Sequence, residues 1–234
     1  MFQRIANEIW VCRRPFKTLG VDISGQMTIV RLKDGRLWLH SPVELDDEIC
    51  AELDLLGPVA YAIAPNSFHH LFLGTVFERY PKAVLYGTRN LFEKRRDLPS
   101  LQFLDDLGPF PWGEDIRQVR MRGNSIMDEV VFYHKLSRTL ILTDLFFNIH
   151  HHDHWPLKLF GKLMGSSGQL SSSRLFRLMI RDKKKFQQSV TTVLRWEIDQ
   201  ILVTHNENLL EGDVKGQLIE AFNSIGFARH RRGG

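Results

Sequence analysis

The segment that decides the fold is LILTD (residues 140–144), a short apolar run that ends in an aspartate. A second segment of the same form, ILVTH (residues 201–205), ends in a histidine. Short apolar runs of this kind are typical of strands buried in a sheet. Because the carboxyl ends of parallel strands meet along one edge, we expect Asp144 and His205 to lie side by side there.

A third apolar run, VAYAIA (residues 59–64), comes just before the pair His69-His70. If this run is a strand of the same fold, both histidines reach the edge that holds Asp144 and His205. Imidazole nitrogen and carboxylate oxygen are ligands that suit zinc, iron(II) or manganese. The sequence therefore predicts a metal site to which all four side chains contribute.

Each of these side chains also has an ordinary structural interpretation. An adjacent histidine pair can cap a helix, Asp144 can cap the segment that follows it, and His205 can donate to a backbone carbonyl group. The position of Asp144 and His205 at the ends of strands favours metal binding over these alternatives.

Around these segments, strand and helix patterns alternate along the chain. We expect a hairpin over residues 27–40, with Asp34-Gly35 in its turn. A helix is expected to begin at Ser41-Pro42, where Glu44 completes a capping box, and to end at Gly57-Pro58. The further predicted elements are a helix over 70–80 and strands over 83–86, 116–121, 129–134 and 139–143.

The composition is that of an ordinary globular protein, with 234 residues of which 43% are hydrophobic and 25% charged. We expect a single domain over residues 1–234. Cys12 and Cys50 lack the spacing of a thiolate metal site or a disulfide framework, which suits a reducing compartment. Neither a targeting segment nor an apolar run of membrane-spanning length is visible, so we expect a soluble cytoplasmic protein.

The net charge of +4 is unevenly distributed along the chain. Residues 174–196 carry seven basic side chains and one acidic one, and their apolar residues have the spacing of an amphipathic helix. We expect one basic helix here, whose charges could guide an anionic substrate. The candidate guiding residues are Arg174, Arg177, Lys183, Lys184 and Lys185. A solvated face is the ordinary alternative, and nucleic-acid binding is not the favoured role.

Residues 155–173 mix glycine and serine with short apolar groups, which predicts a mobile insertion or lid. Just before them, the segment NIHHHDH (residues 148–154) is rich in histidine and could supply further metal ligands. A solvated loop is the alternative for residues 150–154, because consecutive side chains point in different directions.

In element order and in these motifs, the chain resembles the metallo-β-lactamase superfamily from about Ile5 to Phe227. It is more closely similar to a divergent branch described only as a domain of unknown function. The resemblance implies an αββα sandwich, in which two sheets pack face to face, helices lie outside and the metals lie at one edge. The family's signature is T-H-x-H-x-D-H after a strand, a glycine-histidine turn, a glycine-aspartate at a strand end and a last histidine.

Compared with that signature, the metal motif of this chain is degenerate. Pro65 and Ser67 stand at the first two histidine positions, and Asn124 replaces the histidine of the turn, so all three ligands of one metal are missing. For the other metal the resemblance implies four donors, with His69 at the position of the family's aspartate. These donors are His69, His70, Asp144 and His205.

The resemblance implies a hydrolase in which one divalent metal, zinc first and iron or manganese next, activates a water molecule against a small or anionic substrate. Asp144 belongs to the expected catalytic group, and Asn66 and Asn124 could donate hydrogen bonds to the substrate or to that water. The alternative is a scaffold of the same fold that has lost catalysis and serves binding or interaction. A homo-oligomer and a basic adaptor for nucleic acid also stay open.

Overall fold

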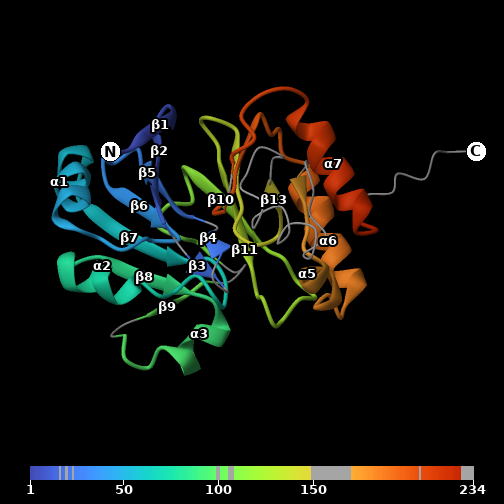
Figure 1. Cartoon of the computed structure of the whole chain (residues 1–234), viewed down its shortest axis with the longest axis horizontal. Coiled ribbons are helices and arrows are strands. Elements are labelled where there is room, and N and C mark those ends of the chain that lie inside the picture. Colours follow the sequence, from blue (N-terminus) through green and yellow to red (C-terminus); the bar gives the residue numbers. More distant parts are fainter. Residues whose placement is uncertain are drawn as a thin grey trace, which may run out of the picture.

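Two β-sheets packed face to face form the centre of the molecule (Figure 1). The computed structural model describes residues 1–15, 17–18, 21–22, 24–98, 101–104, 108–148, 170–205 and 207–227. The first sheet contains, in spatial order, β1 (Gln3–Ala6), β2 (Ile9–Arg14), β5 (Gly25–Arg31), β6 (Leu37–His40), β7 (Val59–Ala64), β8 (Val84–Gly87) and β9 (Gln102–Phe103). Its first four strands are antiparallel, and the pairs from β6 to β9 are parallel.

The second sheet changes direction in the same way. Its strands are β10 (Ile116–Arg120), β11 (Val130–His134), β12 (Thr139–Ile141) and β15 (Gln200–Leu202). The first three form an antiparallel meander, whereas β12 and β15 are parallel. Two short ribbons accompany the sheets, and they pair β13 (Phe147–Asn148) with β14 (Leu170–Ser171) and β3 (Lys17–Thr18) with β4 (Val21–Asp22).

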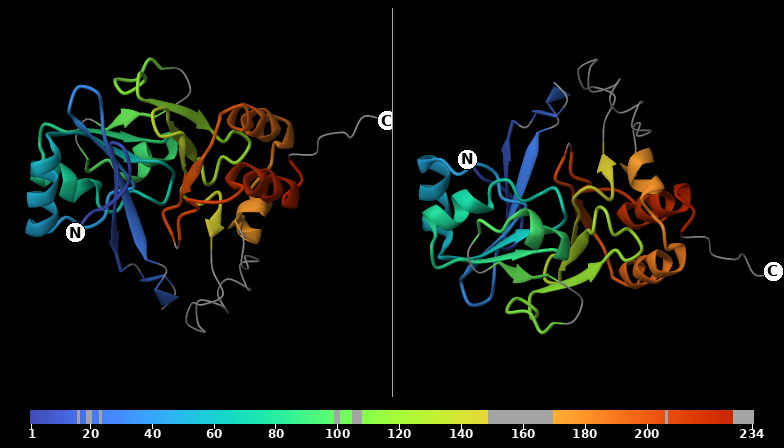
Figure 2. Two further views of the ribbon diagram at one scale, coloured as in Figure 1. Left: turned by 90° about the horizontal axis from the view of Figure 1, so that it is seen from above. Right: turned by 90° about the horizontal axis from the view of Figure 1, so that it is seen from below.

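Helices cover the outer face of each sheet, which gives the αββα order of layers (Figures 1 and 2). The helices on the first sheet are α1 (Asp47–Leu56), α2 (Leu73–Arg79) and α3 (Arg89–Lys94). Those on the second sheet are α5 (Arg174–Leu178), α6 (Lys183–Leu194) and α7 (Val214–Ser224). The expected αββα metallo-β-lactamase-like sandwich is therefore confirmed.

The layer between the two sheets is closed by aromatic side chains. Trp38, Trp112 and Phe132 are all fully buried, and the Trp38 ring centroid lies 5.0 Å from that of Phe132 and 6.1 Å from that of Trp112. Rings packed edge to face at such distances attract each other in addition to the apolar area they remove from water. This core fixes the separation of the sheets and therefore the positions of the loops at their edges.

The predicted helix start at Ser41-Pro42 is wrong. Helix α1 begins at Asp47, and the Asp46 side chain caps it by accepting a hydrogen bond of 2.9 Å from the backbone N–H of Ile49. Asp46 offers the same type of cap as Ser41 at a position five residues later. Ser41 instead has a φ of +51° and its hydroxyl contacts His69.

The single basic helix predicted over 174–196 is also wrong, because the chain forms α5 and α6 with a break between them. At the break, the backbone N–H groups of Arg181 and Asp182 donate to the Gly123 carbonyl at 2.8 and 3.2 Å, and Asp182 caps α6. A Cβ atom at Gly123 would lie 2.2 Å from the Asp182 carbonyl oxygen, so this approach requires glycine. Leu178, expected in the apolar face, is 81% exposed.

Most of the expected lid at 155–173, and all of the histidine-rich tract at 150–154, lie outside the described residues. The last residues of the former are described, and Leu170–Ser171 forms strand β14. Within the described ranges, no helix is long and apolar enough to cross a bilayer. Cys12 is buried and Cys50 is half-buried, and both are free thiols.

Candidate metal centre

The register of two parallel strands brings Asp144 and His205 together. Ile141 of β12 pairs with Leu202 of β15. Asp144 lies three positions after Ile141, and His205 lies three positions after Leu202. Parallel strands advance by equal steps, so the two loops leave the sheet at the same level. Asp144 and His205 therefore face each other at the edge of the second sheet, as the sequence predicts.

His69 reaches the same place from the first sheet, in the loop after β7. Its Nε2 lies 3.3 Å from Nε2 of His205 and 3.2 Å from Oδ2 of Asp144. The third separation, from His205 Nε2 to Asp144 Oδ1, is 3.6 Å. Three side chains from three distant parts of the sequence thus direct their nitrogen and oxygen atoms toward one point.

Both imidazole rings are held through their other nitrogen. His205 Nδ1 lies 2.7 Å from the carbonyl oxygen of Ser24, and His69 Nδ1 lies 2.7 Å from the hydroxyl oxygen of Ser41. A carbonyl oxygen only accepts hydrogen bonds, so His205 carries its proton on Nδ1 and keeps a lone pair on Nε2. Metal-binding histidines typically donate their second N–H to such a group. Neither contact is indicated by the sequence, in which Ser24 is far from His205 and Ser41 is predicted only as the start of a helix.

The two anchoring serines share an uncommon backbone conformation. Ser24 has a φ of +47° and Ser41 has a φ of +51°. Residues other than glycine rarely adopt positive φ, and such strain persists only where the surroundings impose it. The fold therefore accepts a local cost to place a hydrogen-bond partner behind each histidine.

The donor set fits a divalent metal. Ligands of a tetrahedral zinc ion, each bonded at about 2.0–2.1 Å, lie about 3.3–3.4 Å from one another. The three observed separations of 3.2, 3.3 and 3.6 Å span this value. Two histidines and one carboxylate also form the usual set for iron(II), and three protein ligands leave a position open for water or substrate.

Asn66 positions two members of this group. Its Nδ2 donates to Asp144 Oδ2 at 2.7 Å, while its Oδ1 accepts from the backbone N–H groups of Phe68 and His69 at 2.9 and 3.0 Å. Burial works to raise the pKa of Asp144, but His69, His205 and the hydrogen bond from Asn66 lower it well below its usual range. Asp144 is thus a carboxylate at neutral pH, ready to bind a cation.

The pKa of His205 is lowered as well, and burial is the main cause. A neutral imidazole is the form that binds a metal, because its Nε2 lone pair is then available. Phe147 covers the ring, with centroids 6.0 Å apart and the planes nearly parallel. Burial and stacking together keep His205 neutral and fixed in orientation.

Glu129 supports the same loop from inside the protein, and the sequence did not single it out. Its Oε1 accepts from the backbone N–H of Thr143 at 2.9 Å, and its Oε2 accepts from that of Asp144 at 3.0 Å. Complete burial, followed by the nearby Asp144 carboxylate, raises the pKa of Glu129 to about 8. Glu129 fixes the backbone from which Asp144 projects.

His40, at the end of β6, is a second buried group near the site. It is fully buried, its ring stacks on Trp38 with centroids 5.6 Å apart, and its Nε2 lies 3.5 Å from Thr143 Oγ1. Burial is the main cause that lowers the pKa of His40 to about 3, and the nearby His69 adds to the effect. His40 is therefore a neutral, structural histidine behind the candidate metal centre.

His70 does not join the group. Its Nδ1 lies 3.4 Å from Nη1 of Arg95, which also donates to the His70 carbonyl oxygen at 2.6 Å. Burial, followed by the charges of Arg95 and Lys94, lowers the pKa of His70. The structure thus assembles three of the four predicted donors and directs the fourth toward an arginine.

The positions of the missing family histidines form hydrogen bonds within the protein. The Pro65 carbonyl accepts from the backbone N–H of Val130 at 2.8 Å, and the Ser67 N–H donates to the Met127 carbonyl at 3.0 Å. Asn124 Oδ1 accepts from the Met127 N–H at 3.1 Å, which fixes a turn. Asn124 therefore serves the turn, and its role as a donor to substrate or water stays a prediction.

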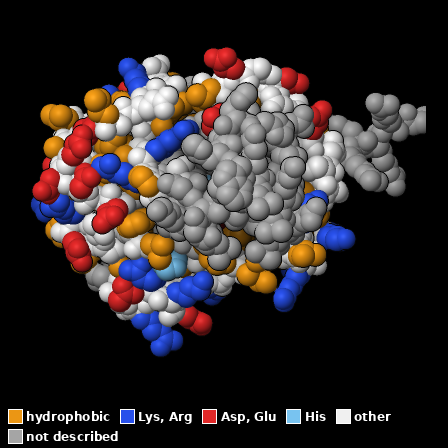
Figure 3. Space-filling view, in the orientation of Figure 1, with side chains coloured by type: hydrophobic (Ala, Val, Ile, Leu, Met, Phe, Trp, Pro, Cys, Tyr) orange, Lys and Arg blue, Asp and Glu red, His pale blue; other side chains and the backbone are white. Residues whose placement is uncertain are grey.

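The candidate guiding residues lie on the helices of the second layer. Arg174 and Arg177 belong to α5, where Arg177 is half-buried, while Lys183, Lys184 and Lys185 are exposed at the start of α6. In Figure 3, Lys and Arg side chains stand at the edge of the molecule where these helices lie, and acidic and basic side chains are intermixed elsewhere on the described surface. Electrostatic guidance by these residues stays a prediction.

Solved structures of similar fold include several metallo-β-lactamases. One from Pontibacter korlensis is 13% identical with a TM-score of 0.66, over 96% of this chain and 98% of that chain. One from Hirschia baltica is 12% identical with a TM-score of 0.62, over 99% of this chain and 98% of that chain. A mutant flavo di-iron protein from Thermotoga maritima is 12% identical with a TM-score of 0.65, over 96% of this chain and 62% of that chain. At such identities the likeness shows the fold alone.

The chain is thus a protein of the metallo-β-lactamase fold with a His-Asp-His group at the sheet edge. It belongs to the family described as "Domain of unknown function (DUF4336)", whose model matches residues 6–160. No curated protein matches its sequence.

Proposed function

We propose that this protein is a hydrolase that uses one divalent metal, held by His69, Asp144 and His205, against a small or anionic substrate. The observation that supports it most is the convergence of three metal-capable side chains, with Nε2 of His69 and of His205 3.3 Å apart and 3.2 and 3.6 Å, respectively, from the two oxygens of Asp144. Lone pairs at such distances repel unless a proton or a cation lies between them. Zinc is the first candidate, and iron or manganese would accept the same ligands.

When bound, the ion would lower the pKa of a water molecule to roughly 7 and so supply a nucleophile at neutral pH. The chain's own residues prepare the site for this role. Ser24 and Ser41 hold the two imidazole rings, while Asn66 and Glu129 hold Asp144. Because these partners fix each donor before an ion arrives, binding requires little rearrangement.

Two exposed apolar side chains belong to the loop that carries His69. Phe68, next to His69, is 48% exposed, and Leu71 is 57% exposed. Exposed apolar groups beside a polar centre favour a substrate that carries an apolar portion next to the bond that is hydrolysed. This proposal also includes a single domain, a lid at residues 155–173 and electrostatic guidance of the substrate by the basic helices.

A second candidate is a binding scaffold of the same fold without catalysis. The observation that favours it is that two side chains at the other metal position bond within the protein, since Ser67 Oγ accepts from Asn90 Nδ2 and Asn124 Oδ1 accepts from the Met127 N–H. Most enzymes expected from the superfamily resemblance would use both positions, so loss of one weakens the case for chemistry. This candidate still permits a structural metal at the remaining site.

Metal content decides whether the proposed centre exists. Protein purified without a metal-affinity column would be analysed by mass spectrometry beside the His205→Ala variant and the His70→Ala variant. We expect about one equivalent of metal in the wild type and in His70→Ala, and little in His205→Ala. Of the two substituted histidines, only His205 is a proposed ligand. His70→Ala is the matched control, since it removes a neighbouring histidine outside the group.

Activity separates the two candidates once metal is found. Ester, thioester and phosphodiester substrates would be tested with the wild type and with Asp144→Asn. Turnover that is lost in the variant and on chelation supports the hydrolase. A metal-loaded protein without turnover on any of these classes would support the scaffold instead.

A further inference from the structure

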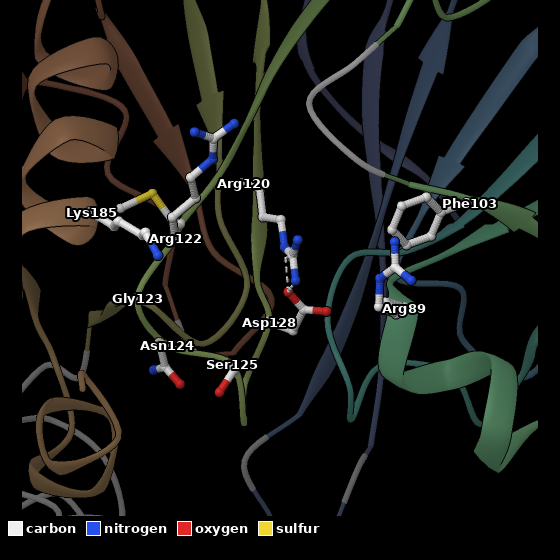
Figure 4. Close-up of a pocket in the computed structure, with 10 residues that line it drawn as sticks. Arg89, Phe103, Arg120, Arg122, Gly123, Asn124, Ser125, Asp128 and Lys185 are labelled. Atoms are coloured by element: carbon white, nitrogen blue, oxygen red, sulfur yellow. Dashed lines mark hydrogen bonds and ion pairs between the residues drawn. The ribbon is translucent and has the colours of Figure 1, made fainter. Parts of the chain in front are cut away.

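A pocket of about 440 Å³ lies between the two halves of the molecule, and its lining includes Asn124 (Figure 4). Its walls come from α3 and β9 on one side and from β10, the turn after it and the start of α6 on the other. The residues that shape its chemistry are Arg89, Phe103, Arg120, Arg122, Asp128 and Lys185. None of the three metal-centre residues lines it, and its volume suits a small organic molecule.

The pocket is strongly cationic. Four of its lining side chains are arginine or lysine, and the only carboxylate among them is Asp128. The guanidinium of Arg89 stacks over the ring of Phe103, with its central carbon 4.7 Å from the ring centroid. Stacking holds the guanidinium plane while its edge N–H groups stay able to bind an oxyanion. Lys185 approaches from the opposite wall.

Asp128 is the unusual member. It is 2% exposed and has a φ of +53°, and its Oδ1 accepts a 2.5 Å hydrogen bond from Arg120 Nε. Its other oxygen, Oδ2, is buried without a hydrogen-bond partner in the described structure. Figure 4 shows this oxygen directed across the pocket toward the side of Arg89. Buried carboxylate oxygens are nearly always bonded, so this one is placed to accept from a ligand.

Hydrogen bonds hold the backbone on both sides of the pocket. The Gly123 carbonyl binds the start of α6, and Asn124 closes the turn that carries Asp128. Asn90 ties that turn to the other half, because its Nδ2 donates to the Ser125 carbonyl at 2.7 Å. Fixed walls lower the ordering cost of binding a ligand.

We propose that this pocket binds a small hydroxylated phosphate, such as a sugar phosphate, with its phosphate at Arg89, a hydroxyl donating to Oδ2 of Asp128, and Lys185 adding positive charge from the opposite wall. The ion pair with Arg120 already balances the charge of Asp128. The other oxygen, Oδ2, therefore needs a neutral hydrogen-bond donor and not a second cation. A phosphate is favoured over an uncharged sugar because the opposite walls both supply cations. This site is independent of the metal centre and of the proposed hydrolysis.

Isothermal titration calorimetry with ribose 5-phosphate, inorganic phosphate and ribose tests the assignment. We expect saturable binding of ribose 5-phosphate, weaker binding of inorganic phosphate and none of ribose. Arg89→Ala should weaken ribose 5-phosphate binding about tenfold or more, and Lys185→Ala should weaken it by a smaller factor. Lys82→Ala removes an exposed lysine that does not line the pocket, and it should leave this binding unchanged.

Asp128→Gly tests the hydroxyl contact separately, because glycine tolerates the positive φ at this position. The variant should lose the preference for ribose 5-phosphate over inorganic phosphate while inorganic phosphate still binds. If it does not fold, as judged by thermal unfolding, the Arg89 and Lys185 variants still decide the question.

The assignment is overturned if ribose 5-phosphate gives no saturable heat at millimolar concentration, or if Lys82→Ala weakens its binding as much as Arg89→Ala. The titration is repeated with chelator and with His205→Ala. Retained binding there shows a site independent of the metal, whereas binding lost in both would overturn this assignment.

Discussion

Two neighbouring positions that the superfamily resemblance assigns to metals differ in how their side chains are bonded. At one, His69, Asp144 and His205 converge with their other polar atoms tied to backbone and side chains. At the other, Ser67 and Asn124 stand where ligands are expected and bond to the protein itself. The contrast teaches that polar side chains at a position without metal ligands need hydrogen-bond partners within the protein. A buried polar group left without one would destabilise the fold.

The largest expected effect is that of acid on stability, through the buried His40 behind the candidate metal centre. Its folded-state pKa of about 3 lies below the ordinary 6.5, so the unfolded chain takes up the proton first as the pH falls. The stability contributed by neutral His40 is full above pH 6.5 and is lost between there and about pH 3. The loss could reach about 5 kcal/mol at most. Urea unfolding from pH 8 to pH 3.5 should show a steeper decline for the wild type than for His40→Gln.

Removing the support of the loop that carries Asp144 should have the next largest effect. In Glu129→Gln, one side-chain oxygen still accepts a hydrogen bond, but an NH₂ group replaces the other oxygen and faces a backbone N–H. That NH₂ group and that backbone N–H are then two buried donors without an acceptor. We expect a loss of about 3 kcal/mol in the free energy of unfolding and a drop of roughly tenfold or more in zinc affinity. Glu78→Gln, on exposed helix surface, should change neither, and an unchanged zinc affinity in Glu129→Gln would remove Glu129 from this role.

Asn124→Ala tests the position at which the family's histidine is missing. The Met127 N–H loses its acceptor, so the free energy of unfolding should fall by about 1–2 kcal/mol. Metal content should stay as in the wild type, because Asn124 belongs to the turn. A variant that unfolds normally but loses its metal would show that the second position still serves the site.

The smallest expected difference compares two serines. Ser41→Ala removes the partner of His69 Nδ1 and should weaken zinc affinity about tenfold. Ser67→Ala, at a former ligand position, should leave zinc affinity unchanged because its hydroxyl contacts Asn90. Competition with a chelating dye measures both, and equal effects of the two substitutions would contradict the contrast.

The parts of the site that follow strands could be predicted from the sequence. The LILTD and ILVTH runs begin in strands β12 and β15 and continue past their ends, and the parallel register of these strands places Asp144 beside His205. VAYAIA is strand β7 with the predicted bounds, and it delivers His69. Short apolar runs with polar residues at their ends carry this information locally.

The supporting residues could not be predicted, because their roles depend on contacts across the fold. Ser24 lies 181 positions from His205 in the sequence, and nothing near either residue indicates the contact. His70 has the same residue type as His69 but turns toward Arg95. The break between α5 and α6 depends on the remote Gly123 carbonyl, which binds residues that local periodicity assigned to one helix.

Anomalous diffraction at the zinc edge, from crystals of zinc-reconstituted protein, tests the central claim most directly. The account predicts one strong peak within about 2.0–2.2 Å of Nε2 of His69, Nε2 of His205 and a carboxylate oxygen of Asp144. Two peaks at this edge, or a single peak bound elsewhere, would contradict it.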